Sequence, residues 1–122
     1  MAHNTIQTDR APAAIGAYSQ AVSAGGWLFV SGQLGMKPET GAIVDTSFGA
    51  QALQALENLQ QILAAGGCAL QDVVSVDVFL ADLDDFAAFN NIYGNFFSDH
   101  RPARAVVEVS ALPKAADIEI KC

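Results

Sequence analysis

A chain of 122 residues is long enough for one domain with a sizeable hydrophobic core. Hydrophobic residues make up 52% of the chain, charged residues make up only 16%, and the formal net charge is −7. Soluble domains usually contain about 25% charged residues, so this composition predicts apolar surface that is covered in an oligomer. An acidic chain repels phosphate backbones, which disfavours nucleic acid as the main partner.

Several other classes of protein are excluded by the pattern of the chain. No segment approaches the roughly 18 apolar residues of a membrane span, and the N-terminus lacks the basic and apolar regions of a signal peptide. The two cysteines, Cys68 and Cys122, are too far apart to indicate a disulfide framework. Neither histidine has the spacing of a metal ligand. The sequence therefore predicts one domain over residues 1–122, soluble in the cytosol or an organelle matrix, without a metal.

The first part of the chain has the pattern of strands. Residues 4–8 form one candidate strand, and residues 17–34 form a hairpin. Its turn is expected at Gly25 and Gly26, since glycine readily adopts the positive φ of a tight turn. A polar turn over residues 36–43 follows.

Residues 45–67 give the clearest helical pattern. Thr46 or Ser47 can cap the helix, and Gly66 and Gly67 end it. The apolar residues at helical spacing are Ala52, Leu56, Leu59 and Leu63.

A strand and a second helix are expected next. Residues 72–83 alternate: Ser75 and Asp77 are predicted to point one way, and the side chains predicted to point the other way are Val74, Val76, Val78 and Leu80. Asp82 can cap a helix that begins near Leu83. The broad apolar face of this helix, which is typical of a core, holds Phe86, Phe89, Tyr93, Phe96 and Phe97.

Residues 103–112 and 116–122 form the last two strands, joined by a turn around Pro113 and Lys114. The order strand, strand, strand, helix, strand, helix, strand, strand predicts an α+β fold with one mixed sheet and two helices on one face. The other face stays in water unless subunits share it, which agrees with the oligomer expected from composition.

Arg104 opens the valine-rich strand of a chain that has only six lysines and arginines. Alternation places it on the same face as Val106 and Glu108. The pattern by itself favours an ion pair with Glu108 or Glu119. The alternative is a guanidinium fork that binds a carboxylate ligand, with a nearby carboxylate for acid–base chemistry.

Four further residues are candidates for a site: Tyr18, Ser31, Gly32 and Asn90. Gly32 follows a hydrophobic strand, where a glycine lets a ligand approach backbone N–H groups. Each of the four also has an ordinary structural interpretation, such as a bulge or a loop cap. The sequence contains no phosphate-binding loop, dinucleotide fingerprint or nucleophile elbow.

Five segments, taken together, resemble the RidA family of reactive-intermediate (enamine/imine) deaminases, which is also called YjgF or L-PSP. They are "APAAIGAYSQAV", "LFVSGQLG", "ALENLQQILAAGG", "VVSVDVFLADLDDFAAFNNIYGNFF" and "RPARAVVEVSALPKAADIEI". The resemblance extends over nearly the whole chain, and its last block is the most specific.

This resemblance implies a chorismate-mutase-like fold that assembles as a homotrimer, with a ligand cleft at each subunit interface. It also implies hydrolysis of 2-aminoacrylate and related 2-enamine or 2-imine acids to 2-keto acids and ammonia, without a cofactor or a metal. By matching position, Arg104 binds the substrate carboxylate, and Glu119 positions and activates water. The residues that line the cleft are then Tyr18, Ser31, Gly32 and Asn90.

The chain departs from the family pattern near Arg104. Many members carry Ser or Thr and often Cys directly after this arginine, where this chain has Ala105 and Val106. Lys121 stands where an acidic residue is frequent, and the chain ends at Cys122, earlier than usual.

Two other functions remain open at this point. The first is a non-catalytic protein that holds small carboxylic acids in the same cleft. The second is the ribonuclease activity associated with the L-PSP name, which the acidic composition and the lack of clustered cations disfavour.

Overall fold

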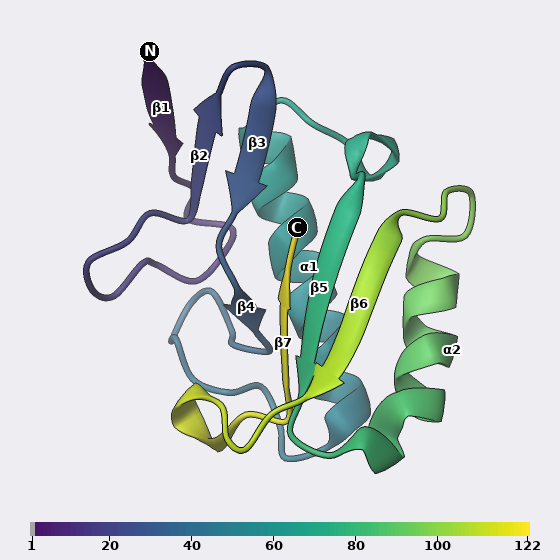
Figure 1. Ribbon diagram of the computed structural model, residues 1–122. Coiled ribbons are helices and arrows are strands. Elements are labelled where there is room, and N and C mark those ends of the chain that lie inside the picture. Colours follow the sequence, from purple (N-terminus) through teal and green to yellow (C-terminus); the bar gives the residue numbers. More distant parts are fainter. Residues whose placement is uncertain (1) are drawn as a thin grey trace.

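The computed structural model describes residues 2–122, which form seven β-strands and two α-helices (Figure 1). The strands are β1 (His3–Ile6), β2 (Ala21–Ala24), β3 (Trp27–Val30), β4 (Gln33–Leu34), β5 (Ser75–Leu80), β6 (Ala103–Glu108) and β7 (Ile118–Lys121). The helices are α1 (Phe48–Ala65) and α2 (Phe86–Phe96). Within residues 2–122 no helix has the length and apolar character needed to cross a membrane.

The first three strands form an antiparallel sheet in the order β1-β2-β3. The hairpin between β2 and β3 turns at Gly25 and Gly26, whose φ values of 58° and 83° confirm the predicted turn. The hairpin strand predicted to reach residue 34 is interrupted at Ser31 and Gly32. After this break β4 leaves the hairpin and pairs with β7.

The other four strands form a mixed sheet in the order β4-β7-β5-β6, in which only β5 and β6 are parallel. The α+β class is therefore confirmed, but the strands form two hydrogen-bonded sheets where one mixed sheet was expected. The two sheets meet where the Val30 N–H donates to the Cys122 carbonyl at 2.9 Å. Beyond this point β3 and β5 lie apart, as Figure 1 shows.

One hydrophobic core joins the helices to the sheets. Helix α1 lies behind β5 and β7 in Figure 1, and its buried side chains pack with alternate residues of these two strands. The fully buried strand residues are Val76, Val78, Leu80, Ile118 and Ile120, and α2 adds Phe89 and Tyr93. Val74 was predicted to point the same way as these residues, but it precedes β5 and is 55% exposed, so it does not join the buried set.

The helix starts follow from their capping residues. Of the two predicted caps of α1, Ser47 is the one used, because its hydroxyl accepts a hydrogen bond from the Ala50 N–H. Asp82 caps a short 3₁₀ turn at Leu83–Asp85, and α2 itself begins only at Phe86.

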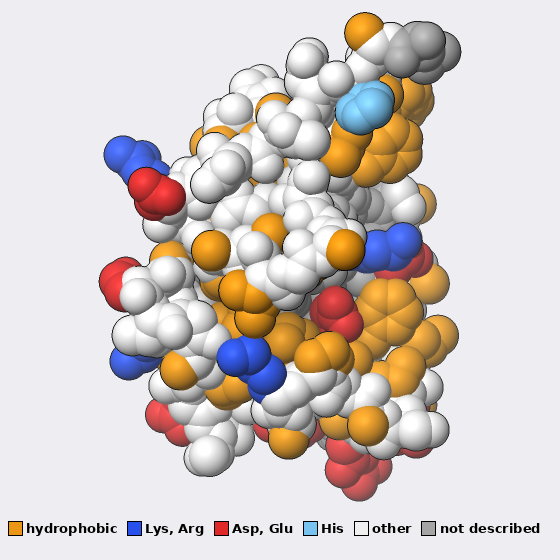
Figure 2. Space-filling view, turned by 90° about the vertical axis from the view of Figure 1, so that its left-hand side faces the viewer, with side chains coloured by type: hydrophobic (Ala, Val, Ile, Leu, Met, Phe, Trp, Pro, Cys, Tyr) orange, Lys and Arg blue, Asp and Glu red, His pale blue; other side chains and the backbone are white. Residues whose placement is uncertain are grey.

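The face of the strands that points away from the core leaves large apolar side chains in contact with solvent. Trp27 and Phe29 of β3 are 55% and 60% exposed, and Val107 of β6 is 47% exposed. Figure 2 shows hydrophobic side chains gathered along its right-hand edge, which is the side of the molecule that faces the viewer in Figure 1. Exposed apolar side chains that gather on one face are typical of an interaction surface.

A buried polar contact fixes β4 and the turn that follows it. Asn58 of α1 is 1% exposed, and its amide donates to the carbonyls of Leu34 and Met36 at 3.2 and 2.9 Å. Its carbonyl oxygen accepts a hydrogen bond from Gln54 at 2.9 Å. The single side chain therefore holds the irregular backbone after β4 against the helix.

We expect Asn58→Ala to lower the free energy of unfolding by about 1–3 kcal/mol, because the buried Met36 carbonyl loses the side-chain donor and the Leu34 carbonyl keeps only the Met36 N–H. Urea denaturation followed by circular dichroism measures this change. The matched control is Gln60→Ala on the exposed side of the same helix, for which we expect a change within about 0.5 kcal/mol. Equal losses in both variants would contradict the role assigned to Asn58.

Candidate functional site

The six predicted site residues lie in two separate pockets. The first, here called the Glu119 pocket, has a volume of about 460 Å³ and includes Tyr18, Ser31, Gly32 and Glu119. The second, the Arg104 pocket, has a volume of about 320 Å³ and includes Asn90 and Arg104. The structure thus brings together four of the residues in one place and two in another.

Glu119 projects from the middle of β7. Its neighbours Ile118 and Ile120 point into the core, so alternation sends the Glu119 carboxylate to the opposite face of the sheet. There it is only partly exposed, and burial raises its pKa above the ordinary value of 4.5. A carboxyl group with a raised pKa holds and releases a proton at a higher pH than a solvated one, which suits acid–base chemistry.

Gly32 lies directly against the Glu119 carboxylate. A Cβ added at Gly32 would overlap the side chain of Glu119, so any other residue would displace the carboxylate. The requirement for glycine is one of space, because the φ of Gly32 lies outside the left-handed region. The break between β3 and β4 is therefore also a place where backbone lies close to the Glu119 carboxylate.

The Ser31 hydroxyl donates to the Ser19 carbonyl at 2.6 Å, while the Ser31 N–H donates to the Gln20 carbonyl at 2.9 Å. These two bonds fix the backbone beside Gly32 and leave the lone pairs of the hydroxyl oxygen for other donors. Tyr18 lies on the adjacent loop and is 49% exposed. It is placed where its ring can cover a ligand in the Glu119 pocket.

Gln20 holds the loop that carries Tyr18. It is 3% exposed, its amide donates to the Pro12 and Thr8 carbonyls at 2.8 and 3.1 Å, and its carbonyl accepts from the Thr8 N–H at 2.7 Å. Sequence reasoning missed this residue, because a glutamine beside a strand carries no signal of burial until its partners are known.

Arg104 lies against α2 and is held by four side chains of that helix. Its Nη2 donates to Asn90 Oδ1 at 2.5 Å. Its guanidinium carbon lies 4.8, 5.4 and 5.9 Å from the ring centres of Tyr93, Phe89 and Phe86. These four residues share one face of α2, since they are three and four positions apart. Aromatic faces attract the cation and hold the plane of the fork in one orientation.

The ion pair that the pattern favoured for Arg104 is wrong. Glu108 accepts a hydrogen bond from the Leu83 N–H at 2.8 Å, and Glu119 lies in the other pocket. Within residues 2–122 the one ion pair joins Lys121 to Asp77 at 3.7 Å. Arg104 therefore keeps guanidinium donors free for a ligand.

Arg104 and Glu119 point to opposite faces of the same sheet. In the strand register Arg104 is the partner of Val76, whereas Glu119 is the partner of Phe79. Val76 faces the core and Phe79 faces the other way, and paired residues share a face. Strand β5 also separates the strands that carry them. Within one chain the two side chains do not meet.

Two cations that were not predicted as site residues also line the pockets. Lys114, which has a φ of 58°, lines the Glu119 pocket, and its Nζ donates to the Gly41 carbonyl at 3.1 Å. Arg101 lines the Arg104 pocket. The scarcity of cations in this chain was the signal that could have pointed to them. In residues 2–122 no group of His, Cys, Asp and Glu could hold a metal ion.

The two residues after Arg104 have different surroundings. Ala105 is the register partner of Asp77 and is exposed on the face opposite Arg104. Val106 shares the face of Arg104 and packs against the core. Of these two residues, only Val106 therefore lies on the side of the sheet that carries the Arg104 guanidinium.

The comparisons with known proteins agree with this structure. The family model described as Endoribonuclease L-PSP matches residues 8–122. The chain is 50% identical over 116 residues to the 2-iminobutanoate/2-iminopropanoate deaminase of Rattus norvegicus, covering 95% of this chain and 85% of that protein. It is 48% identical to a RutC family protein of Pyrococcus horikoshii, covering 95% of this chain and 92% of that protein.

Solved structures show the same fold. RidA from an Antarctic Psychrobacter is 50% identical, with a TM-score of 0.93 over 97% of this chain and 95% of that one. TdcF of E. coli, solved with bound serine, is 41% identical, with a TM-score of 0.92 over 97% of this chain and 94% of that one. Similarity at this level of identity, over almost the whole chain, shows which family the protein belongs to. The chain belongs to the RidA family, also known as YjgF or L-PSP.

Proposed function

We propose that this protein is a 2-iminobutanoate/2-iminopropanoate deaminase, which hydrolyses reactive 2-enamine and 2-imine acids to 2-keto acids and ammonia. The observation that carries the proposal is the similarity to the rat deaminase, at 50% identity over 95% of this chain. The two pockets support it chemically, because one holds a guanidinium with free donors and the other a carboxyl group with a raised pKa.

The reaction needs few catalytic groups. Protonation of the 2-aminoacrylate methylene carbon gives the iminium form of the imine, and water then adds to C2 with loss of one proton to give a neutral aminoalcohol. The resulting aminoalcohol expels ammonia and leaves pyruvate. Arg104 binds the substrate carboxylate, while Glu119 accepts a proton from the attacking water and returns it to the leaving nitrogen. Positioning and one acid–base group suffice, since the substrate is already reactive.

The site is completed by a second copy of the chain. Because Arg104 and Glu119 face opposite sides of the sheet, one subunit supplies the Arg104 pocket and its neighbour supplies the Glu119 pocket. We place these clefts between the subunits of a homotrimer with a chorismate-mutase-like arrangement. The exposed apolar side chains of Trp27, Phe29 and Val107 favour such an assembly, since association removes them from water.

The Arg104→Ala variant is expected to lower kcat/KM for 2-aminoacrylate by about 100-fold, because a bidentate, charge-assisted contact with the substrate carboxylate is lost. Arg104→Lys keeps the charge without the planar fork and should recover only part of the loss. The measurement is keto-acid release from 2-aminoacrylate generated in situ, above the spontaneous rate.

The control for this experiment is Arg10→Ala, which removes an exposed cation outside both pockets and should leave the rate unchanged. A wild-type protein that binds 2-keto acids without exceeding spontaneous hydrolysis would instead be a non-catalytic binding protein. RNA cleavage that is lost in Arg104→Ala, with no deaminase activity, would favour the ribonuclease.

The pH dependence of kcat should reflect the protonation of Glu119. Only the deprotonated carboxylate can accept a proton from water, so kcat should fall as the pH drops through the Glu119 pKa. Burial raises this pKa, so the inflection should lie above 4.5. Glu119→Gln should reduce kcat by about 10²–10⁴-fold and remove the inflection, while keto-acid binding persists. A variant with the wild-type rate would remove Glu119 from the mechanism.

Mixed oligomers test whether each site spans two subunits. Arg104→Ala and Glu119→Gln chains are each expected to be inactive, but random co-assembly at equal amounts should restore about one quarter of the wild-type activity. That fraction is the chance that an intact Arg104 pocket meets an intact Glu119 pocket across an interface. Mixing the two without subunit exchange is the control. Co-assembly without recovery would contradict a shared site.

A further inference from the structure

The Arg104 pocket concentrates positive charge in an acidic chain. The chain has six lysines and arginines against thirteen aspartates and glutamates. Two of the six cations line this one pocket, and none of the acids does. The lining residues are Asn90, Tyr93, Gly94, Arg101, Pro102 and Arg104. The pocket is therefore a local positive site on a molecule whose net charge is −7.

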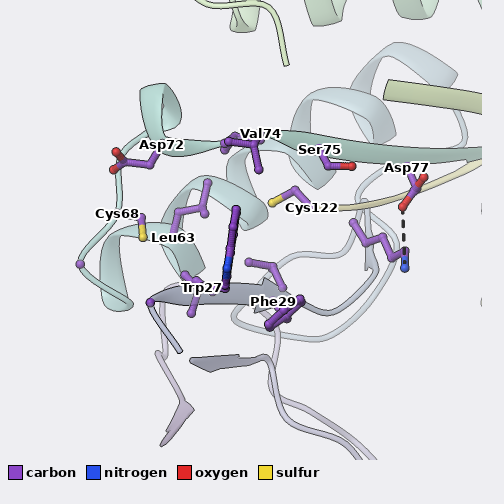
Figure 3. Close-up of a pocket in the computed structure, with 15 residues that line it drawn as sticks. Trp27, Phe29, Leu63, Cys68, Asp72, Val74, Ser75, Asp77 and Cys122 are labelled. Carbon is purple, nitrogen blue, oxygen red and sulfur yellow. Dashed lines mark ion pairs between the residues drawn. The ribbon is translucent and has the colours of Figure 1, made fainter. Parts of the chain in front are cut away.

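No acid in the described part of the chain neutralises either arginine. Lys121 is paired with Asp77, and the dashed line in Figure 3 marks this contact. It is the one ion pair of residues 2–122, so Arg101 and Arg104 have none there. Burial raises the pKa of the Tyr93 hydroxyl, although both arginines act to lower it, so the hydroxyl is neutral near pH 7. The two guanidiniums meet no negative charge in the pocket, which favours an anionic ligand.

Arg101 is held against the same helix as Arg104. Its Nη1 donates to the Gly94 carbonyl at 3.5 Å, whereas Arg104 donates to Asn90. A Cβ at Gly94 would lie 3.4 Å from Arg101 Nη1, so the glycine leaves room for the guanidinium against α2. Pro102 restricts the backbone of the residue before it to extended conformations, which limits the directions of the Arg101 side chain. One long hydrogen bond leaves the other N–H groups of Arg101 free.

The two arginines are spaced for a ligand with two carboxylates. Their partners on α2, Asn90 and Gly94, are four residues apart, which corresponds to about 6 Å along the helix axis. An extended five-carbon diacid places its carboxylate carbons about 5 Å apart, because four carbon–carbon bonds of about 1.5 Å join them. Each carboxylate can then meet one guanidinium in a charge-assisted contact. A monocarboxylate leaves Arg101 without a partner.

We propose that this protein prefers 2-imino acids that carry a second carboxylate, with Arg104 binding the C1 carboxylate and Arg101 binding the distal one. Within this class, 2-iminoglutarate has the matching length. The inference rests on the proposed deaminase function and makes Arg101 a specificity-determining residue of the same reaction. Water adds to C2 and ammonia leaves, so 2-iminoglutarate gives 2-ketoglutarate, and the distal carboxylate is bound without being changed.

The first test compares hydrolysis of 2-iminoglutarate with that of 2-iminohexanoate, which has a chain of similar length and no second carboxylate. An amino-acid oxidase forms each imine in situ from glutamate or 2-aminohexanoate, and keto-acid release above the spontaneous rate is measured. We expect kcat/KM of the wild type to be about five- to tenfold higher for 2-iminoglutarate. Arg101→Ala should remove this preference, and Arg101→Lys should keep part of it. The control Arg10→Ala, which removes an exposed cation outside both pockets, should keep all of it.

Binding of the products tests the same contact without catalysis. Calorimetry gives the Kd values of 2-ketoglutarate and 2-ketohexanoate, and Arg101→Ala should weaken only the preference for the first, by about five- to tenfold. The preference should also shrink at high salt, because mobile ions screen exposed charges. A merely structural role of Arg101 would not produce this dependence on salt.

The outcomes separate this inference from the proposed function. A protein that hydrolyses 2-aminoacrylate but shows no preference for 2-iminoglutarate would overturn the inference and leave the deaminase function standing. A protein that hydrolyses none of these imines would overturn both. A preference that survives Arg101→Ala and disappears in Lys114→Ala would place the distal carboxylate in the Glu119 pocket, which also overturns the inference.

Discussion

The alternation of side chains along β5 and its two neighbours is the constraint on which the rest of the structure depends. Val76, Val78 and Leu80 point to the helices and form the core, so the residues between them must point away. The same rule carries over to β6 and β7 through their register with β5. It places Arg104 under α2 and Glu119 on the opposite face. The proposed need for a second subunit follows from this geometry.

Polar contacts then shape the irregular backbone around Glu119. The break at Gly32 brings backbone against the carboxylate, Gln20 holds the loop before it, and Asn58 holds the turn after β4. None of these contacts adds to a regular sheet or helix. Gln20 and Asn58 donate to the buried carbonyls of Pro12 and Met36, and leaving such groups without a donor is costly. The Glu119 pocket is thus built where the sheet is interrupted.

Sequence patterns predicted the regular parts of this fold well. The turn at Gly25 and Gly26, the capped helix α1 and the buried alternation of β5 depend on neighbours in the chain, and the structure confirms them. The patterns failed where partners are distant. They extended the alternation to Val74 and favoured an ion pair for Arg104, because a pattern cannot tell which strand or helix lies alongside.

The sequence by itself determined the α+β class, the family and the set of residues proposed for the site, since these depend on local periodicity and on short matching segments. Only the tertiary structure decided which of those residues lie together. Strand order and register are long-range properties, and a shift of one residue moves a side chain to the other face. That is why the sequence could name Arg104 and Glu119, while their separation by the sheet became visible only in three dimensions.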